Sequence, residues 1–185
     1  MYYVLILNNF IKFCQLFIDK YPDITIIDNF ITEKECNMLI NLSEPHLKNS
    51  VTGNFQTVSN YRTSKSVTIH PNNITDKIVE KLENIITIPR NYYESIQITK
   101  YSKGQYYKPH YDSSNNLIRS KTLIIYLSDN YTGGYTDFPL LKKKFKLKKG
   151  SAILFDNIDK NNNIHFLSLH QGTSVYKGNK WIATI

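Results

Sequence analysis

The stretch Tyr106-Tyr107-Lys108-Pro109-His110-Tyr111-Asp112 decides the fold predicted for this sequence. It places a histidine and a carboxylate two positions apart. On a β-strand, residues i and i+2 point to the same face, so His110 and Asp112 can offer a ring nitrogen and a carboxylate oxygen to one point. His170, from a distant strand, would complete a set of two histidines and one carboxylate. Such a set leaves other positions of an octahedral ion open, as non-haem Fe(II) sites require.

Short strands are predicted on both sides of this stretch, from about residue 94 to the end of the sequence. The strongest are the buried run Lys121 to Leu127 and the segments Ser151 to Phe155, Phe166 to His170 and Lys180 to Ile185. We place these strands in a double-stranded β-helix, or jelly roll, whose two sheets would bring the His110 and His170 strands face to face. Lys180, on the strand after His170, could supply a fixed cation for a dicarboxylate.

Helices are predicted before residue 94. Thr32 and Glu35 form the pattern of a capping box, which starts a helix that runs to about Leu42. Thr75 is the expected N-cap of a second helix. Helices followed by many strands indicate an α+β fold. We therefore expect a single domain over residues 1–185, with a helix-rich support over about 1–93 and the jelly-roll core over about 94–185.

Length and composition fit a single globular domain. The chain has 185 residues, a formal charge of +8, and two cysteines, Cys14 and Cys36, which form no disulfide framework or CxxC motif. Cysteine usage and the lack of a clear signal peptide favour an intracellular setting. The apolar stretch Val4 to Ile18 is too short and too interrupted for a transmembrane segment, and its apolar positions from Leu7 to Ile18 predict an amphipathic helix. The lysine-rich segment 142–149 is either a solvated hairpin or a patch for an acidic partner.

Taken together, the motifs resemble the prolyl 4-hydroxylases, which are 2-oxoglutarate- and Fe(II)-dependent dioxygenases. The resemblance covers about residues 22–185 and is carried by the following segments: Tyr101 to Asp112, Arg119, Thr122, Tyr126-Leu127, Gly133 to Pro139, Lys149-Gly150, Leu154-Phe155, His170 to Gly172, and Lys177 to Trp181. Upstream, Asp28 to Phe30, Arg62 to Ser64 and Gln97 match as well. Two departures concern substrate fit rather than the metal ligands: Ser174 precedes Val175 where the family often has proline, and the sequence stops at Ile185, before the place of a second tryptophan.

The resemblance implies a role for each matching residue. It implies that His110, Asp112 and His170 hold Fe(II), and that Lys180 pairs with the far carboxylate of 2-oxoglutarate, assisted by the hydroxyls of Tyr101 and Thr136. Lysine at this place is the collagen-type pattern, whereas the oxygen-sensing prolyl hydroxylases and the lysyl hydroxylases use arginine. Arg62, Arg119 and Trp181 are expected near the peptide substrate.

The implied reaction is oxidative decarboxylation of 2-oxoglutarate by O2 to succinate and CO2, coupled to hydroxylation of a peptidyl proline, with ascorbate as a supporting reductant. The partner would be a proline-containing polypeptide, collagen-like or not. Alternatives are a hydroxylase of another residue such as lysine, and a non-catalytic jelly-roll module that binds peptide. Nucleic-acid demethylation is disfavoured, because such enzymes usually bind the co-substrate with arginines after the last histidine, and no arginine follows His170.

Overall fold

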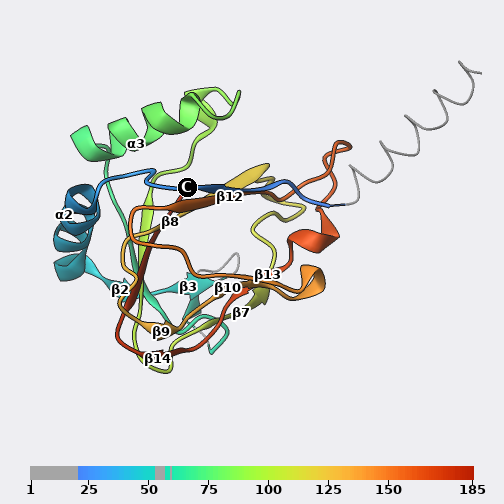
Figure 1. Cartoon of the computed structure of the whole chain (residues 1–185). Helices are drawn as coiled ribbons and strands as arrows, with labels where there is room; N and C mark the ends of the chain where they lie inside the picture. The colour runs from blue at the N-terminus through green and yellow to red at the C-terminus, as the bar shows by residue number, and fades with distance from the viewer. Residues whose placement is uncertain (1–20, 53–56, 59) are drawn as a thin grey trace, which may run out of the picture.

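The computed structural model describes residues 21–52, 57–58 and 60–185, and places them in two facing β-sheets with helices on one side (Figure 1). The large sheet has seven strands in the order β1-β12-β8-β15-β6-β5-β2. Its strands are β1 (Ile24–Ile27), β12 (Ala152–Asp156), β8 (Lys121–Tyr126), β15 (Lys180–Thr184), β6 (Gln97–Tyr101), β5 (Lys65–Thr68) and β2 (Lys48–Asn49). The predicted helix at Leu7 to Ile18 lies outside the described residues.

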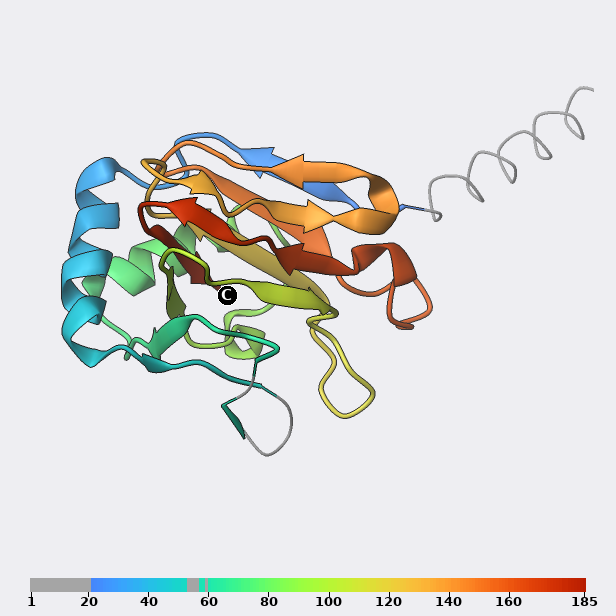
Figure 2. The ribbon, with the colours of Figure 1, turned by 90° about the horizontal axis from the view of Figure 1, so that it is seen from below.

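The small sheet has four strands in the order β11-β10-β13-β7 and faces the large one (Figures 1 and 2). These strands are β11 (Lys143–Phe145), β10 (Thr136–Phe138), β13 (His170–Gly172) and β7 (Tyr107–His110). Two-stranded ribbons, β9 (Thr132–Gly133) with β14 (Val175–Lys177) and β3 (Val51–Thr52) with β4 (Thr57–Val58), complete the strands. The architecture is the expected α+β jelly roll.

Both faces of the large sheet are covered, and the central strand β8 shows why. Leu123 and Ile125 point to the side of the helices, whereas Ile124 and Tyr126 point into the space between the sheets. A strand that is buried on both faces has a continuous apolar run, as Lys121 to Tyr126 does. The alternation divides the core into an outer layer under the helices and an inner layer between the sheets.

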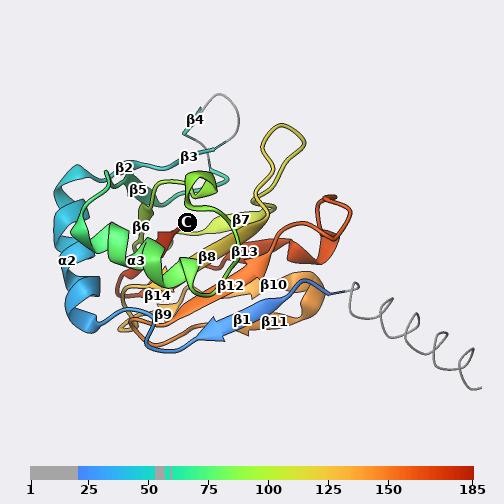
Figure 3. The same ribbon diagram turned by 90° about the horizontal axis from the view of Figure 1, so that it is seen from above.

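The two helices cover the outer face of the large sheet (Figure 3). Helix α2 (Glu33–Ser43) begins with the predicted capping box of Thr32 and Glu35. Helix α3 (Asn73–Glu83) is capped by Asn72, with Thr75 at its third position; the prediction of Thr75 as N-cap was therefore wrong by three residues. No helix within the described part of the chain is long and apolar enough to cross a membrane.

Two further predictions about the strands need correction. β7 and β13 are antiparallel neighbours in the small sheet, with His110 opposite His170, and do not face each other from two sheets. The segment Phe166 to Ser168 is a turn of 3-10 helix, and β13 starts only at His170. The first half of the chain contributes β1, β2 and β5 to the large sheet, so its support of the core is by strands as well as helices.

Gly150 holds the loop before β12 against the chain at Ile31. Its amide donates to the carbonyl of Tyr126 (2.8 Å), and its carbonyl accepts from the amide of Ile31 (3.0 Å). It has φ +87°, and a Cβ there would lie 2.3 Å from the carbonyl oxygen of Ile31. Only glycine fits both requirements.

Gly150→Ala is expected to lower the free energy of unfolding by more than the roughly 1–2 kcal/mol of left-handed strain alone, because the clash with the Ile31 carbonyl adds to it. Urea denaturation measures the change. Gly104→Ala is the matched control, since Gly104 has φ +81° and nothing within 4 Å of its added Cβ. Equal losses in the two variants would contradict the proposed clash.

Candidate metal and co-substrate site

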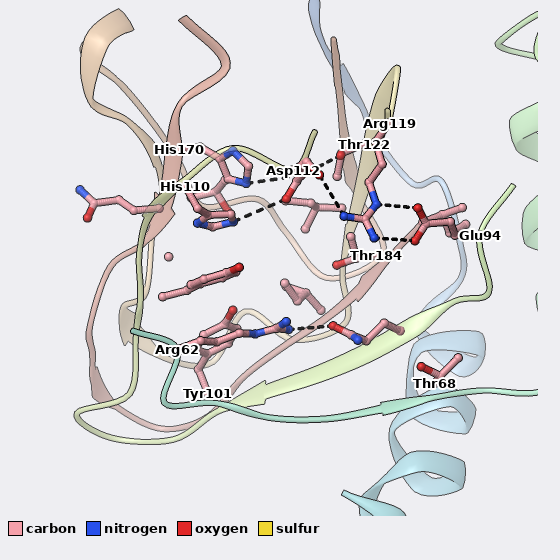
Figure 4. A pocket seen from close by; sticks show the side chains of 18 of the residues that line it. Arg62, Thr68, Glu94, Tyr101, His110, Asp112, Arg119, Thr122, His170 and Thr184 are labelled. Atoms are coloured by element: carbon pink, nitrogen blue, oxygen red, sulfur yellow. Dashed lines mark hydrogen bonds and ion pairs between the residues drawn. The ribbon is translucent and has the colours of Figure 1, made fainter. Parts of the chain in front are cut away.

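His110, Asp112 and His170 come together between the two sheets. One ligand atom from each lies within 4.8 Å of the others. The Nε2 atoms of His110 and His170 are 3.5 and 3.6 Å from the two carboxylate oxygens of Asp112 (Figure 4). His110 ends β7, His170 begins β13, and Asp112 lies two residues beyond the end of β7. Strand pairing brings the histidines together, and the local H-x-D spacing adds the carboxylate.

Both histidines present Nε2 to the shared point because main-chain carbonyls hold their other nitrogen. Nδ1 of His110 donates to the carbonyl of Lys108 (2.7 Å), and Nδ1 of His170 donates to that of Ser168 (3.0 Å). A carbonyl only accepts, so Nδ1 carries the proton and Nε2 keeps its lone pair. This arrangement orients a histidine for metal binding.

The protonation states also suit a cation. Burial among Phe138 and Phe155 lowers the pKa of His170 to about 4, so its ring is neutral at neutral pH. For Asp112, burial raises the pKa, but the two neighbouring histidines and the hydrogen bond from Thr122 outweigh it and keep the pKa below its usual range. A neutral imidazole and an ionised carboxylate are the forms that bind metal.

Two further side chains hold Asp112 in place. The hydroxyl of Thr122 donates to Oδ2 of Asp112 (2.7 Å). Arg119 donates from Nη1 to the Asp112 main-chain carbonyl (2.9 Å) and forms a two-pronged ion pair with Glu94, including an Nη2–Oε2 contact of 2.9 Å (Figure 4). The loop after β7 is thereby fixed to Glu94, which precedes β6.

Lys180 supplies a buried cation on the opposite wall. Its ammonium lies 3.4 Å from the hydroxyl of Thr136 and over the rings of Tyr101 and Tyr126 at 5.6 and 5.5 Å. Among the described residues it has no acidic partner, and burial lowers its pKa to about 7. Tyr101 is opposite Lys180 in the β6–β15 pair. A buried ammonium without a counter-charge is suited to receive the carboxylate of a ligand.

A cavity of about 770 Å³ connects these groups. Its lining includes the side chains of His110, Asp112 and His170. It also includes Lys180, Tyr101 and Thr136, which are nearly fully buried. It also includes Val51 and Leu117, which are exposed. The cavity therefore has a closed end at the lysine and an open end at the surface.

Of the three residues expected near a peptide, two line the cavity and one does not. Arg62 and Arg119 line the cavity, and Arg62 donates to Gln97 (2.8 Å) and Thr99 (3.1 Å). Trp181 points the other way, into the outer core layer, where the ammonium of Lys100 lies 4.8 Å from its ring centroid. Neighbours on a strand face opposite sides, so Lys180 in the cavity places Trp181 outside it. Trp181 is therefore not retained as a substrate contact.

Sequence reasoning missed three residues of the site. The Tyr126 hydroxyl donates to that of Thr136 (2.7 Å), Glu94 holds Arg119, and the side-chain amide of Asn157 donates to Thr122 (2.8 Å). Tyr126, as a polar side chain at the end of the apolar run Leu123 to Ile125, carried a usable signal. Glu94 and Asn157 contact residues 25 and 35 positions away, so no local pattern marks them.

Comparison with known proteins gives consistent matches. Residues 96–185 match the model of the 2OG-Fe(II) oxygenase superfamily. A probable prolyl 4-hydroxylase of Arabidopsis thaliana is 33% identical over 88% of this chain and 68% of its own length. A putative prolyl 4-hydroxylase of Acanthamoeba polyphaga mimivirus is 32% identical over 90% of this chain and 74% of its own.

Solved structures match the same part of the chain. The viral collagen prolyl hydroxylase of Paramecium Bursaria Chlorella virus-1, solved as a 2OG complex, superposes with a TM-score of 0.71 at 31% identity and covers 87% of this chain and 93% of that one. A prolyl hydroxylase of Trichoplax adhaerens, with a TM-score of 0.67 and 20% identity over 87% of this chain and 81% of that one, shares the fold.

Proposed function

The chain belongs to the prolyl 4-hydroxylases of the 2OG-Fe(II) oxygenase superfamily, and from that membership we propose how its residues hydroxylate peptidyl proline. It is a 2-oxoglutarate-dependent dioxygenase that uses Fe(II) and O2. The observation that carries the assignment of roles is the position of the His110–Asp112–His170 cluster and the buried ammonium of Lys180 in one cavity.

We assign Fe(II) to the two Nε2 atoms and the Asp112 carboxylate. The donor set fits the ion: two imidazoles and one carboxylate, each oriented by a hydrogen bond from or to the protein. When bound, the metal supplies the activation of O2 that drives decarboxylation of 2-oxoglutarate and hydroxylation. The protein side chains supply binding, orientation and exclusion of water.

Lys180 is assigned to the far carboxylate of 2-oxoglutarate. Its ammonium lies at the closed end of the cavity, next to the Thr136 hydroxyl, which can donate a second hydrogen bond once the carboxylate is bound. Tyr101 packs against the ammonium and shields it from solvent. A charge-assisted contact at a dry site is stronger than the same contact in water, so Lys180 fixes the orientation of the co-substrate.

The polypeptide is assigned to the open end of the cavity. Arg62 and Arg119 line the same cavity and are held in place by Gln97 and Glu94. We propose that the substrate is proline in collagen-like repeats. The viral collagen prolyl hydroxylase matches over nearly its whole length, and the lysine at position 180 is the collagen-type pattern.

Succinate release from 2-oxoglutarate, with Fe(II) and ascorbate, tests the proposal directly. We expect a collagen-like peptide with proline before glycine to stimulate release and to gain one oxygen atom on proline by mass spectrometry. The matched control is the same peptide with alanine in place of that proline. A peptide of unrelated sequence with a single proline tests the repeat requirement, and a lysine-containing peptide tests the alternative hydroxylation.

The possible results separate the candidates. Oxygen added to proline in both proline peptides supports prolyl hydroxylation but not the preference for repeats. Oxygen added to lysine would overturn the assignment of proline. Iron binding without succinate release from any peptide would indicate a binding module.

A further inference from the structure

A two-step chain of hydrogen bonds runs from Asn157 through Thr122 to Asp112. The side-chain amide of Asn157 donates to the Thr122 hydroxyl (2.8 Å), which donates to Oδ2 of Asp112 (2.7 Å; Figure 4 shows the second bond). Asn157 and Thr122 are nearly inaccessible to solvent. The geometry points to Thr122 and Asn157 as positioning residues for the metal-binding carboxylate, an inference that rests on the proposed role of Asp112.

The chemistry of the three groups fixes the direction of this chain. An ionised carboxylate only accepts, so Thr122 must use its single hydroxyl proton toward Asp112. The second partner of Thr122 must then be a donor, which an asparagine amide nitrogen is and an aspartate at position 157 would not be. The chain therefore requires a hydroxyl at 122 and a donor at 157.

The fold holds both residues rigidly. Thr122 is on β8 opposite Phe155 of β12, and Asn157 follows two residues later, so its side chain returns to the same face. The main-chain N–H of Asn157 donates to the carbonyl of Ser120 (2.8 Å), and the main-chain carbonyl of Asn157 accepts from the N–H of His165 (2.8 Å). His165 is buried.

The main chain of Asn157 also leads to the second histidine. The carbonyl of His165 accepts from the amide of Ser168 (2.8 Å), and the carbonyl of Ser168 accepts from Nδ1 of His170 (3.0 Å). Asn157 thus supports Asp112 through its side chain and the segment that orients His170 through its backbone. Asn157, one residue beyond β12, is thus linked through hydrogen bonds to both proposed ligands.

Thr122 also limits how the carboxylate can bind. Because the Thr122 hydroxyl donates to Oδ2 of Asp112, it favours binding of a metal ion through Oδ1. Without that hydroxyl, both oxygens become available and the carboxylate can rotate. We therefore expect a change in the coordination of the ion as well as in its affinity.

Thr122→Val keeps the shape of the side chain and removes the hydroxyl. We expect about 10- to 100-fold weaker binding of Mn(II) to the full chain, measured from the electron paramagnetic resonance signal of free Mn(II). The visible absorption spectrum of bound Co(II), which reports coordination, should also change. Thr122→Ser restores the hydroxyl and should return both readouts close to wild type.

Further variants keep the test decisive if Thr122→Val folds poorly. Asn157 bonds to Thr122 and not to Asp112. Asn157→Leu should therefore weaken Mn(II) binding only about 2- to 10-fold, as expected for the loss of one neutral hydrogen bond. Ile125→Val trims the same strand on its other face and should lower the melting temperature without changing affinity. Asp112→Ala defines complete loss of the site.

Each result has a separate meaning. Wild-type affinity and an unchanged Co(II) spectrum in Thr122→Val, with binding lost in Asp112→Ala, would overturn the inference and leave the proposed metal site intact. Equal Mn(II) binding by wild type and Asp112→Ala would instead overturn the proposed site, and the inference with it. Weakened binding that Thr122→Ser rescues supports the positioning role.

Discussion

Asp112→Ala is expected to abolish measurable succinate release. Loss of an outer hydrogen-bond partner of a metal ligand costs about 10- to 100-fold in activity or affinity, so loss of a ligand itself should exceed that range. The effect is on chemistry rather than on folding, because Asp112 lies at the cavity wall after β7 and outside both core layers. Succinate release with saturating Fe(II) and 2-oxoglutarate measures it.

The thermal melt of the same variant provides the control. In the wild type, Mn(II) should raise the melting temperature by binding only the folded state, and Asp112→Ala should lose this shift while melting at a similar temperature without metal. Asp129→Ala removes a carboxylate outside the cavity lining and should behave as wild type in both assays. Normal turnover by Asp112→Ala would rule out its role as a ligand.

Lys180→Met should have opposite effects on function and on stability. Removal of a charge-assisted hydrogen bond, worth about 1.5–3 kcal/mol, should raise the 2-oxoglutarate KM about 10- to 100-fold. Methionine fills a similar volume without a buried charge, so the protein without 2-oxoglutarate should become more stable. Measurements of the 2-oxoglutarate KM and of the melting temperature at pH 6.5 test the two effects. A variant with a higher KM and a lower melting temperature would indicate that Lys180 is structural.

The sign of the pH dependence follows from the lowered pKa of Lys180, which is about 7 in the folded protein against 10.5 for an ordinary lysine. Below pH 7, Lys180 is charged in both the folded and the unfolded protein, so the full desolvation cost of burying the ammonium opposes folding. As pH rises from 7 toward 10.5, the folded state releases the proton first, so the cost declines. The stability gained by Lys180→Met should therefore be largest at or below pH 7 and shrink at alkaline pH.

The same titration should affect co-substrate binding. Because 2-oxoglutarate pairs with the charged form, its affinity for the wild type should fall as pH rises above about 7. Lys180→Arg keeps its charge throughout this range and should show a flatter profile, even if the larger guanidinium lowers the affinity itself. Parallel profiles for the two proteins would contradict the titration of Lys180.

The sequence was most informative where the chemistry is local. His110 and Asp112 are two residues apart, and Thr32 and Glu35 three apart, so the metal pair and the capping box could be predicted without knowledge of the fold. The apolar run of β8 similarly indicated a strand buried on both faces. In each case the pattern spans only a few consecutive residues.

Interactions between distant segments could not be predicted in the same way. The pairing of β7 with β13, the burial of His165 and the bond from Asn157 to Thr122 all depend on how loops return to the sheets. Asn72 and Thr75 are both capable of capping the second helix. Asn72 is the N-cap, and its side chain accepts from the main-chain N–H groups of Ile74 and Thr75. Local preference alone does not rank such neighbours.

The two proposed binding groups stand on different sheets: the histidines on the small sheet and Lys180 on the large one. The inner core layer, with Tyr126, Phe138 and Phe155, keeps these sheets apart. The thickness of this layer therefore sets the distance between the proposed metal ligands and Lys180. A diacid one carbon shorter or longer than 2-oxoglutarate would fit one end of the site and miss the other, so side chains that never touch the co-substrate determine the chain length it must have.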